Sequence, residues 1–141
     1  MSRRLNTYPP FLGAGIRVVR FAPDLTCFDV RMKLRWWNRN VIGTHFGGSL
    51  YMMCDPFYVL ILIAALGEDH VVWDKAARIR FWRPGRGTVY ARFHVPPEEI
   101  AEIRRLAAEQ DKVEPTYVAR VVDDRGKIVA QVEKELHVRR R

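Results

Sequence analysis

The segment GTHFGGSLYMMCDPF, residues 43–57, combines a glycine pair with a carboxylate inside an otherwise apolar run. Gly47 and Gly48 precede the run, and Asp55 follows Gly47 by eight residues. A carboxylate in apolar surroundings costs free energy unless a partner pairs with it or a reaction uses it. Glycines at the start of a helix leave N–H groups that a ligand can approach closely. We therefore predict a site in which this backbone holds a carbonyl oxygen and Asp55 is a nucleophile or general base.

Each of these residues also has a purely structural interpretation. Asp55 followed by Pro56 is a typical helix start, with the acid as N-cap and the proline as the first helical residue. The glycine pair can equally be a turn. Arg83, which opens the turn sequence RPGR, either begins a solvated turn or meets the phosphates of a ligand. His45 either orients the loop or lies exposed, because the four histidines lack metal-ligand spacing, and we expect no metal or other cofactor.

A buried helix must position the glycines and the acid. Residues 56–67 carry no charge, and these twelve residues make about 18 Å of helix, too short for a hydrocarbon core of about 30 Å. We expect a core helix that starts near Gly47 and no membrane span. Because proline disfavours helical geometry in the residue before it, this helix should kink at Asp55.

Six strands are expected around this helix. Residues 27–36 alternate charged and apolar side chains with the period of a strand, and their dry face is Phe28, Val30, Met32, Leu34 and Trp36. The other strands are expected at residues 16–21, 71–82, 88–95, 116–122 and 127–138. Residues 98–110 predict a second, amphipathic surface helix. The order ββαββαββ predicts an α+β fold with an antiparallel sheet curled around the central helix.

Length and charge set the broad class. The 141 residues predict one domain, residues 1–141, with flexible tails at residues 1–12 and 139–141. The net charge of +8 favours an anionic partner, whether nucleic acid, a membrane surface or a phosphorylated small molecule. Cys27 and Cys54 are too few and too apolar in setting for a disulfide framework, and no export signal is visible. We therefore expect a cytoplasmic protein.

The motifs carry a resemblance to a known superfamily. GTHFGGSLYMMCD, followed 24 residues after Asp55 by IRFWRPGRG, resembles the signature of hotdog-fold thioesterases of the phenylacetate-pathway type. The whole chain is similar to a group labelled tetrameric acyl-CoA thioesterases. The resemblance implies a hotdog fold, in which the sheet wraps around a long central helix, and the hydrolysis of an acyl-CoA thioester. Two positions depart from the pattern: Phe46 stands where many relatives have His, and Pro56 directly follows the acid.

Thioester chemistry gives these residues specific roles. The carbonyl oxygen gains negative charge during attack, so the N–H group of Gly48, with that of Gly47, would stabilise the transition state more than the substrate. Asp55 would attack directly or activate water. A thiol leaving group with a pKa of about 8.5 needs no general acid. Arg83 would contact CoA. The other expected substrate-binding residues lie in the loop before the glycines: Asn40, Thr44, His45 and Phe46.

The spacing of the site residues predicts assembly. Gly47 and Asp55 are about 12 Å apart along a helix axis, beyond the reach of an aspartate side chain. If both serve one thioester, the carboxylate comes from another subunit, as the resemblance to hotdog dimers also implies, so a homodimer is the minimum catalytic unit. The resemblance leaves open whether the assembly is a dimer or a tetramer built as a dimer of dimers.

Two alternative functions compete with thioester hydrolysis. The two departures from the pattern support a non-catalytic acyl- or lipid-binding hotdog protein. Nucleic-acid binding through KLRWWNRN, residues 33–40, has less support, because one strand with a wet basic face explains that stretch. We therefore expect no nucleic-acid partner.

Overall fold

The computed structural model of the protein describes residues 2–141. Its elements are, in chain order, α1 (Ser2–Asn6), α2 (Pro9–Ala14), β1 (Ile16–Phe21), β2 (Cys27–Lys33), α3 (Gly47–Met52), α4 (Phe57–Leu66), β3 (His70–Phe81), β4 (Thr88–His94), α5 (Pro97–Glu109), β5 (Thr116–Val122) and β6 (Ile128–Arg140). All six predicted strands and both predicted helical regions are present.

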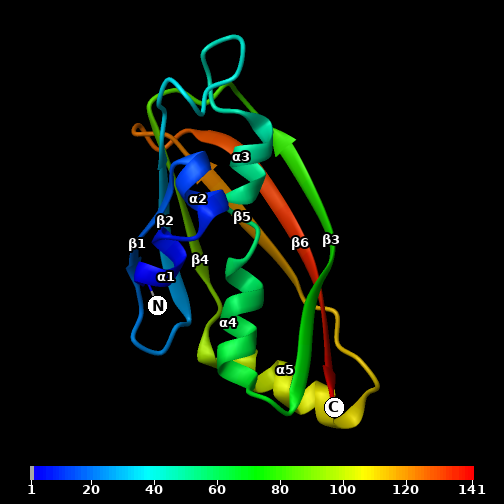
Figure 1. Ribbon diagram of the computed structural model, residues 1–141. Coiled ribbons are helices and arrows are strands. Elements are labelled where there is room, and N and C mark those ends of the chain that lie inside the picture. The colour runs from blue at the N-terminus through cyan, green and yellow to red at the C-terminus, as the bar shows by residue number, and fades with distance from the viewer. Residues whose placement is uncertain (1) are drawn as a thin grey trace.

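The six strands form one antiparallel sheet in the order β1-β2-β4-β5-β6-β3, so β1 and β3 are its edges. The sheet curves around α3 and α4, and α5 lies across one end of it (Figure 1). The predicted α+β architecture, a six-stranded antiparallel sheet around a central helical segment with one further surface helix, is confirmed.

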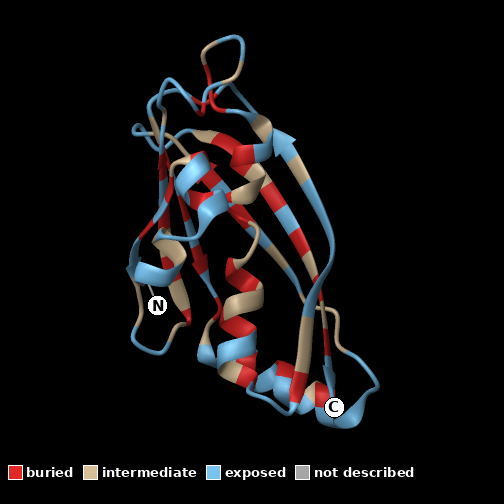
Figure 2. Cartoon of the chain, viewed as in Figure 1, coloured by how far each residue is buried: buried red, intermediate tan, exposed pale blue. Residues whose placement is uncertain are grey.

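The core lies between the sheet and α4. Alternate residues of β2 and β4 face inward, and Phe28, Val30 and Phe93 are buried there. Phe57, at the start of α4, stacks on Phe93 with ring centroids 4.7 Å apart. In Figure 2 buried residues recur along α4 and along several strands of the sheet, whereas most of β3 is exposed or half-buried. The buried apolar residues of the sheet and the helices thus form one connected hydrophobic core.

The central helix is interrupted at the predicted position. α3 ends at Met52 and α4 begins at Phe57, with Asp55 and Pro56 in the break. The expected kink at Asp55 is therefore confirmed, and it separates two helices. No side-chain hydrogen bond caps the start of α4. The N-cap role considered for Asp55 is therefore not what the structure shows.

The stretch Gly47–Leu66 is long and apolar enough to cross a membrane by length and composition alone. The length argument based on residues 56–67 therefore does not decide the question by itself. Half of the apolar window is buried inside the fold, as in the core helix of a globular protein, and the helical break lies within it.

Regular structure extends into both chain ends, where flexible tails were expected. Residues Pro9–Ala14 form α2, whose two prolines occupy the first turn, where a missing N–H group has no cost. Phe11 is only 1% exposed and lies 6.0 Å from Phe57 between ring centroids. Asn6 ties α1 to β1, because it exchanges two hydrogen bonds with the backbone of Val18. At the other end, β6 continues to Arg140. Residue 1 of the expected tail lies outside the described residues.

β2 ends three residues earlier than predicted. The amide side chain of Asn38 accepts a hydrogen bond from the backbone N–H of Arg35 at 2.7 Å and donates to the carbonyl oxygen of Lys33 at 2.9 Å. This turn takes Trp36 out of the predicted dry face and leaves it 76% exposed. The account of residues 33–40 as one strand with a wet basic face is therefore wrong beyond Lys33.

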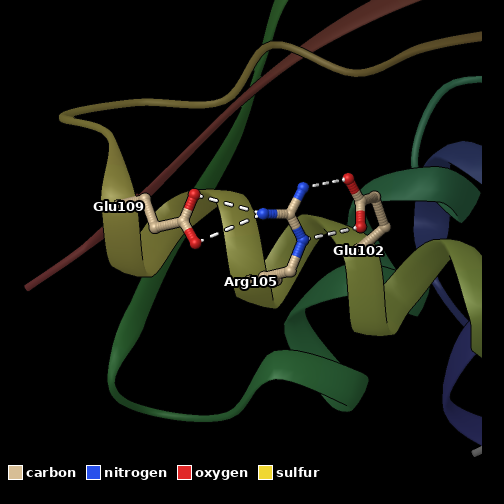
Figure 3. Close-up of polar contacts among 3 residues, drawn as sticks. All are labelled: Glu102, Arg105 and Glu109. Carbon is tan, nitrogen blue, oxygen red and sulfur yellow. Dashed lines mark hydrogen bonds and ion pairs between the residues drawn. The ribbon is translucent and has the colours of Figure 1, made fainter.

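α5 is the predicted surface helix. Ile100, Ile103 and Ala107 are buried, as its amphipathic pattern requires. On its outer side, Arg105 binds Glu102 at 2.6 Å and Glu109 at 3.1 Å (Figure 3). All three side chains are more than half exposed, so water screens these ion pairs, and packing of the apolar side holds the helix in place.

Candidate active site

Asp55 lies in the break between α3 and α4 with its side chain half exposed. Its Oδ1 accepts hydrogen bonds from the Tyr51 hydroxyl at 3.2 Å and from Lys134 Nζ at 3.2 Å. Within residues 2–141 no hydrogen bond to Oδ2 is formed. One carboxylate oxygen is therefore anchored in the protein, and the other is free to meet a substrate or a water molecule.

Lys134 is the residue of this cluster that our sequence reasoning missed. It occupies an inward position of β6 between Val132 and Leu136, and its side chain is 0% exposed. Its Nζ lies 3.0 Å from Asp74 Oδ1 on β3 and 2.9 Å from the backbone carbonyl oxygen of Asp55. The signal was present in the sequence: the period of two along β6 places this lysine on the apolar face.

Burial and charge act in opposite directions on this cluster. Burial by itself lowers the pKa of Lys134, but hydrogen bonds to Asp74 and Tyr51 and the charges of Asp74 and Asp55 outweigh it and raise that pKa. The pKa of Asp74 is also raised, because burial outweighs the effect of the ammonium group that it shares with Asp55. Lys134 therefore stays charged at neutral pH.

Cys54 neighbours Asp55 but is not a candidate nucleophile. Burial raises the pKa of its thiol to about 12. The thiolate is the reactive form of cysteine, and it is scarcely populated at neutral pH with such a pKa. Asp55 is therefore the stronger nucleophile candidate at the break.

A second set of candidate residues surrounds a surface pocket of about 400 Å³, which we call the loop pocket. It lies where the loop before α3 meets the turn after β3. Its lining residues are Asn40, Ile42, Thr44, His45, Gly47, Leu50, Phe81, Trp82, Arg83, Pro84 and Gly85. Five predicted site residues are thus brought together here: Asn40, Thr44, His45, Gly47 and Arg83.

The loop before α3 is closed by its own polar side chains. Asn40 Nδ2 donates to Thr44 Oγ1 at 2.9 Å, and Asn40 Oδ1 accepts from the backbone N–H of Thr44 at 3.0 Å. These contacts explain why Asn40 and Thr44 stand at this spacing. Their contact with a substrate stays a prediction.

His45 joins this loop to the turn after β3. Its Nε2 lies 2.7 Å from the carbonyl oxygen of Gly87, and its backbone N–H donates to the carbonyl oxygen of Gly85 at 2.9 Å. The side chain is buried, and burial lowers its pKa. Of the two interpretations of His45, the structure thus supports the one in which it orients the loop.

Gly47 and Gly48 occupy the first two positions of α3, where N–H groups have no partner in a preceding helical turn. A Cβ atom on Gly48 would lie 2.7 Å from the Phe46 ring, and one on Gly47 would lie 3.1 Å from the Phe81 ring. Two aromatic rings of the same chain therefore occupy the space that side chains would need. Close approach of these rings explains the glycine pair structurally, whatever the pair does chemically.

The structure does not bring all predicted site residues together within one chain. Asp55, Gly48 and Phe46 are not among the residues that line the loop pocket. Gly47 begins α3, whereas Asp55 lies beyond the other end of that helix, as the spacing argument requires. The candidate residues therefore fall into two separate groups within the described chain, an acid cluster around Asp55 and the lining of the loop pocket.

Comparisons with known proteins give the family. Residues 1–138 match the family model described as "Domain of unknown function (DUF4442)". Among curated proteins no sequence matches the chain. The fold is similar to that of several solved structures.

One of these is PA5026 of Pseudomonas aeruginosa, a protein of unknown function described as "Probable Thioesterase". Its sequence is 21% identical to this one, the match covers 99% of this chain and 94% of that chain, and the TM-score is 0.86. Thioesterase HI1161 of Haemophilus influenzae has 14% identity, coverage of 97% and 87%, and a TM-score of 0.69. A mutant of the phenylacetic acid degradation protein PaaI of Thermus thermophilus has 25% identity, coverage of 92% and 97%, and a TM-score of 0.61. These likenesses confirm the expected hotdog fold. The chain therefore belongs to the family described as "Domain of unknown function (DUF4442)" and shares the hotdog fold of these solved structures.

Proposed function

We propose that the protein is an acyl-CoA thioesterase in which Asp55 is the catalytic carboxylate. The observation that carries this proposal is the state of that side chain: half exposed, with Oδ1 anchored by Lys134 and Tyr51 and with Oδ2 unpaired within the described chain. The thioesterase neighbours of the fold support the class of reaction.

Asp55 could hydrolyse the thioester by either of two routes. As a nucleophile, Asp55 Oδ2 bonds to the carbonyl carbon, the C–S electron pair leaves with the CoA sulfur, and water hydrolyses the resulting anhydride. As a general base, Asp55 takes a proton from water while the water oxygen attacks the carbonyl carbon; the C–S electron pair then leaves with the CoA sulfur, and the proton passes to the solvent or to that sulfur. In both routes the N–H groups of Gly48 and Gly47 would hold the carbonyl oxygen as it gains negative charge. The free acid and CoA are the products.

A homodimer is part of the proposal. Asp55 and the loop pocket are separated by α3 within one chain, so a partner chain would complete the site. β3 supports this arrangement, because it is a twelve-residue edge strand whose unpaired backbone can take up another strand. Asp74 lies on this strand and contacts Lys134, so the acid cluster lies beside the edge at which a partner would pair.

The loop pocket is the proposed binding site for the substrate. Exposed Phe81, Trp82 and Ile42 line it with apolar surface for an acyl chain or the pantetheine arm. Arg83 also lines a neighbouring pocket of about 440 Å³, in which Arg86, Arg125 and Lys127 outnumber the two carboxylates, Asp123 and Asp124. These basic side chains would suit the phosphates of CoA.

A cytoplasmic location is also part of the proposal. The free thiols of Cys27 and Cys54 support it, because disulfides are rare in a reducing compartment.

One observation favours the alternative, an acyl- or lipid-binding protein without catalysis. The Phe46 ring covers the backbone at Gly48, because a Cβ atom there would lie 2.7 Å from it. If the ring keeps a carbonyl oxygen away from this N–H group, binding would occur without turnover. Phe46 is more than half exposed, so the ring has room to move aside.

A panel of acyl-CoA thioesters separates the two functions. The protein is incubated with aliphatic and aromatic acyl-CoAs and a thiol reagent, and binding is measured in parallel by calorimetry. Release of CoA at a rate proportional to protein concentration supports the thioesterase. Saturable binding with no CoA released by the wild-type protein or by Phe46→Ala supports the binding protein and contradicts the proposal.

A further inference from the structure

Lys134 is the one buried Lys or Arg side chain in the described part of the protein. It stands on the apolar side of β6, where Val132 and Leu136 flank it. Taking an ammonium group out of water costs several kcal/mol, and replacing a buried ion pair with an apolar residue is often neutral or stabilising. Stability alone therefore does not explain a lysine at this position.

The contacts of Lys134 converge on one residue. Its Nζ donates to the backbone carbonyl oxygen of Asp55 at 2.9 Å and to Oδ1 of the same residue at 3.2 Å. The Tyr51 hydroxyl accepts from Lys134 at 3.2 Å and itself lies 3.2 Å from Asp55 Oδ1. The ammonium group thus fixes both the backbone and the carboxylate of Asp55, at a break where the helix provides no regular hydrogen-bond pattern.

Asp74 holds Lys134 from the opposite side. Its Oδ1 lies 3.0 Å from Nζ, and it comes from β3, the strand that pairs with β6. Without this second carboxylate the flexible lysine side chain would have partners on the helical side alone. Asp74 therefore limits the positions that the ammonium group can take up relative to Asp55.

We propose that Lys134 is a positioning residue for Asp55 and that Asp74 holds Lys134 in place, so that Oδ1 is occupied and Oδ2 is left for the reaction. This inference rests on the proposed function, because it gives the anchored carboxylate a catalytic purpose. Lys134 does not touch the reacting atoms; it acts through Asp55.

Kinetics of Lys134→Met and Asp74→Asn provide the first test. Lys134→Met should lower kcat about 10- to 100-fold with little change in KM, because a misplaced carboxylate loses rate more than binding. Asp74→Asn should do the same to a smaller degree. Both proteins should fold, since Asp55 and Asp74 are partly exposed and can be hydrated once the ammonium group is gone. Thermal melting checks this point.

The matched control is Lys112→Met. Lys112 lies after α5, outside the edge strand β3, and forms an exposed ion pair with Glu114 at 3.0 Å. This variant should keep the wild-type kcat. A folded Lys134→Met protein with kcat within about twofold of wild type would overturn the inference, because a displaced catalytic group costs more than that.

A double-mutant comparison separates positioning from a merely structural role. Adding Lys134→Met to Asp55→Ala should cause no further loss of rate, because the lysine acts through the missing carboxylate. A full additional loss in that background would overturn the inference while leaving Asp55 as the catalytic carboxylate.

A chemical test needs no turnover. A water-soluble carbodiimide with an amine labels carboxyl groups, and mass spectrometry reports the extent at Asp55. Asp55 should be labelled several-fold faster in Lys134→Met than in the wild type, because the ammonium group no longer holds Oδ1 in a hydrogen bond. Equal labelling would contradict the positioning role. Faster labelling in a protein that releases no CoA would uphold the contact and count against the proposed function alone.

Discussion

Lys134 and Asp55 lie 79 positions apart in the sequence, yet Lys134 Nζ is 2.9 Å from the backbone carbonyl oxygen of Asp55 and 3.2 Å from its Oδ1. This contact joins the break of the central helix to the inner face of β6. The orientation of the candidate catalytic acid thus depends on the sheet as well as on the helix that carries it. Predictions for the site therefore involve residues from both layers.

Arg83 should matter for the nucleotide part of the substrate. It lines both the loop pocket and the adjacent basic pocket, so Arg83→Gln removes a charged donor between them. We expect KM for acyl-CoA to rise about tenfold, the scale of one charge-assisted hydrogen bond. A pantetheine thioester without the nucleotide phosphates should show no such change. Arg120→Gln, on the outer face of β5, is the control, and an equal effect of the two variants would argue against the role of Arg83.

Asn40 should hold the loop pocket in shape. Asn40→Ala removes the side-chain hydrogen bonds to Thr44, to the backbone N–H of Ile42 and to the carbonyl oxygen of His45, each worth about 1 kcal/mol. We expect a lower melting temperature and a higher KM, measured by calorimetry and by steady-state kinetics. Asn40→Asp keeps the acceptor oxygen and should lose less of both. An Asn40→Ala protein with wild-type KM would show that the loop does not shape the substrate site.

His45 should make stability depend on pH. Burial lowers its pKa below the ordinary 6.5, although the hydrogen bond to Gly87 opposes this shift. A lowered folded-state pKa means that the unfolded chain binds the proton first. The stabilising contribution is therefore complete above pH 6.5 and is lost as the pH falls through the lower folded-state pKa. Protonation would also leave Nδ1, which has no hydrogen-bond partner within the described chain, as a buried donor.

Thermal melts of wild type and His45→Gln between about pH 8 and about pH 5, the range in which histidine titrates, measure this contribution. The difference in melting temperature between the two proteins should shrink on acidification, because glutamine can donate to the Gly87 carbonyl but does not titrate. A constant difference across this range would contradict the assignment.

Mixed dimers test whether two chains build one site. Asp55→Ala and Gly48→Val should each be inactive, the first by losing the acid and the second by shielding the N–H group. In an equal mixture that is refolded together, about half of the dimers are mixed, and each has one intact site. Activity should return to about a quarter of the wild-type value. Mixed dimers seen by native mass spectrometry without activity would show that each chain carries its own site.

Local patterns predicted most of the fold. β1 and β5 begin and end where alternation and turn residues placed them, and the helical break lies at the predicted proline. The prediction failed where contacts between residues far apart in the sequence determine where an element begins or ends. β2 stops at Lys33 because Asn38 reaches back to that strand and to the carbonyl oxygen of Ala14 at 2.9 Å, which no period in residues 27–36 reveals. α1 and α2 likewise depend on packing against β1 and the core.

The candidate site, like the fold, was predicted where local sequence determines it and missed where long-range contacts do. The spacing of Gly47 and Asp55 predicted their separation within one chain, and the loop residues Asn40 and Thr44 lie together at the loop pocket. Lys134 and Asp74 were missed because neither stands near a motif. Their contact depends on the pairing of β3 with β6, whose partners are far apart in the sequence. A lysine at an apolar position of a strand was the one signal that sequence alone offered.

The rate of CoA release by Asp55→Ala, compared with wild type on the best acyl-CoA of the panel, tests the central claim most directly. Both proteins must show the same far-ultraviolet circular dichroism and the same oligomeric state. We predict a fall in kcat of about 10² to 10⁴, the usual scale for a positioned catalytic carboxylate. A variant that releases CoA at the wild-type rate would contradict the assignment of Asp55 and, with it, the catalytic account.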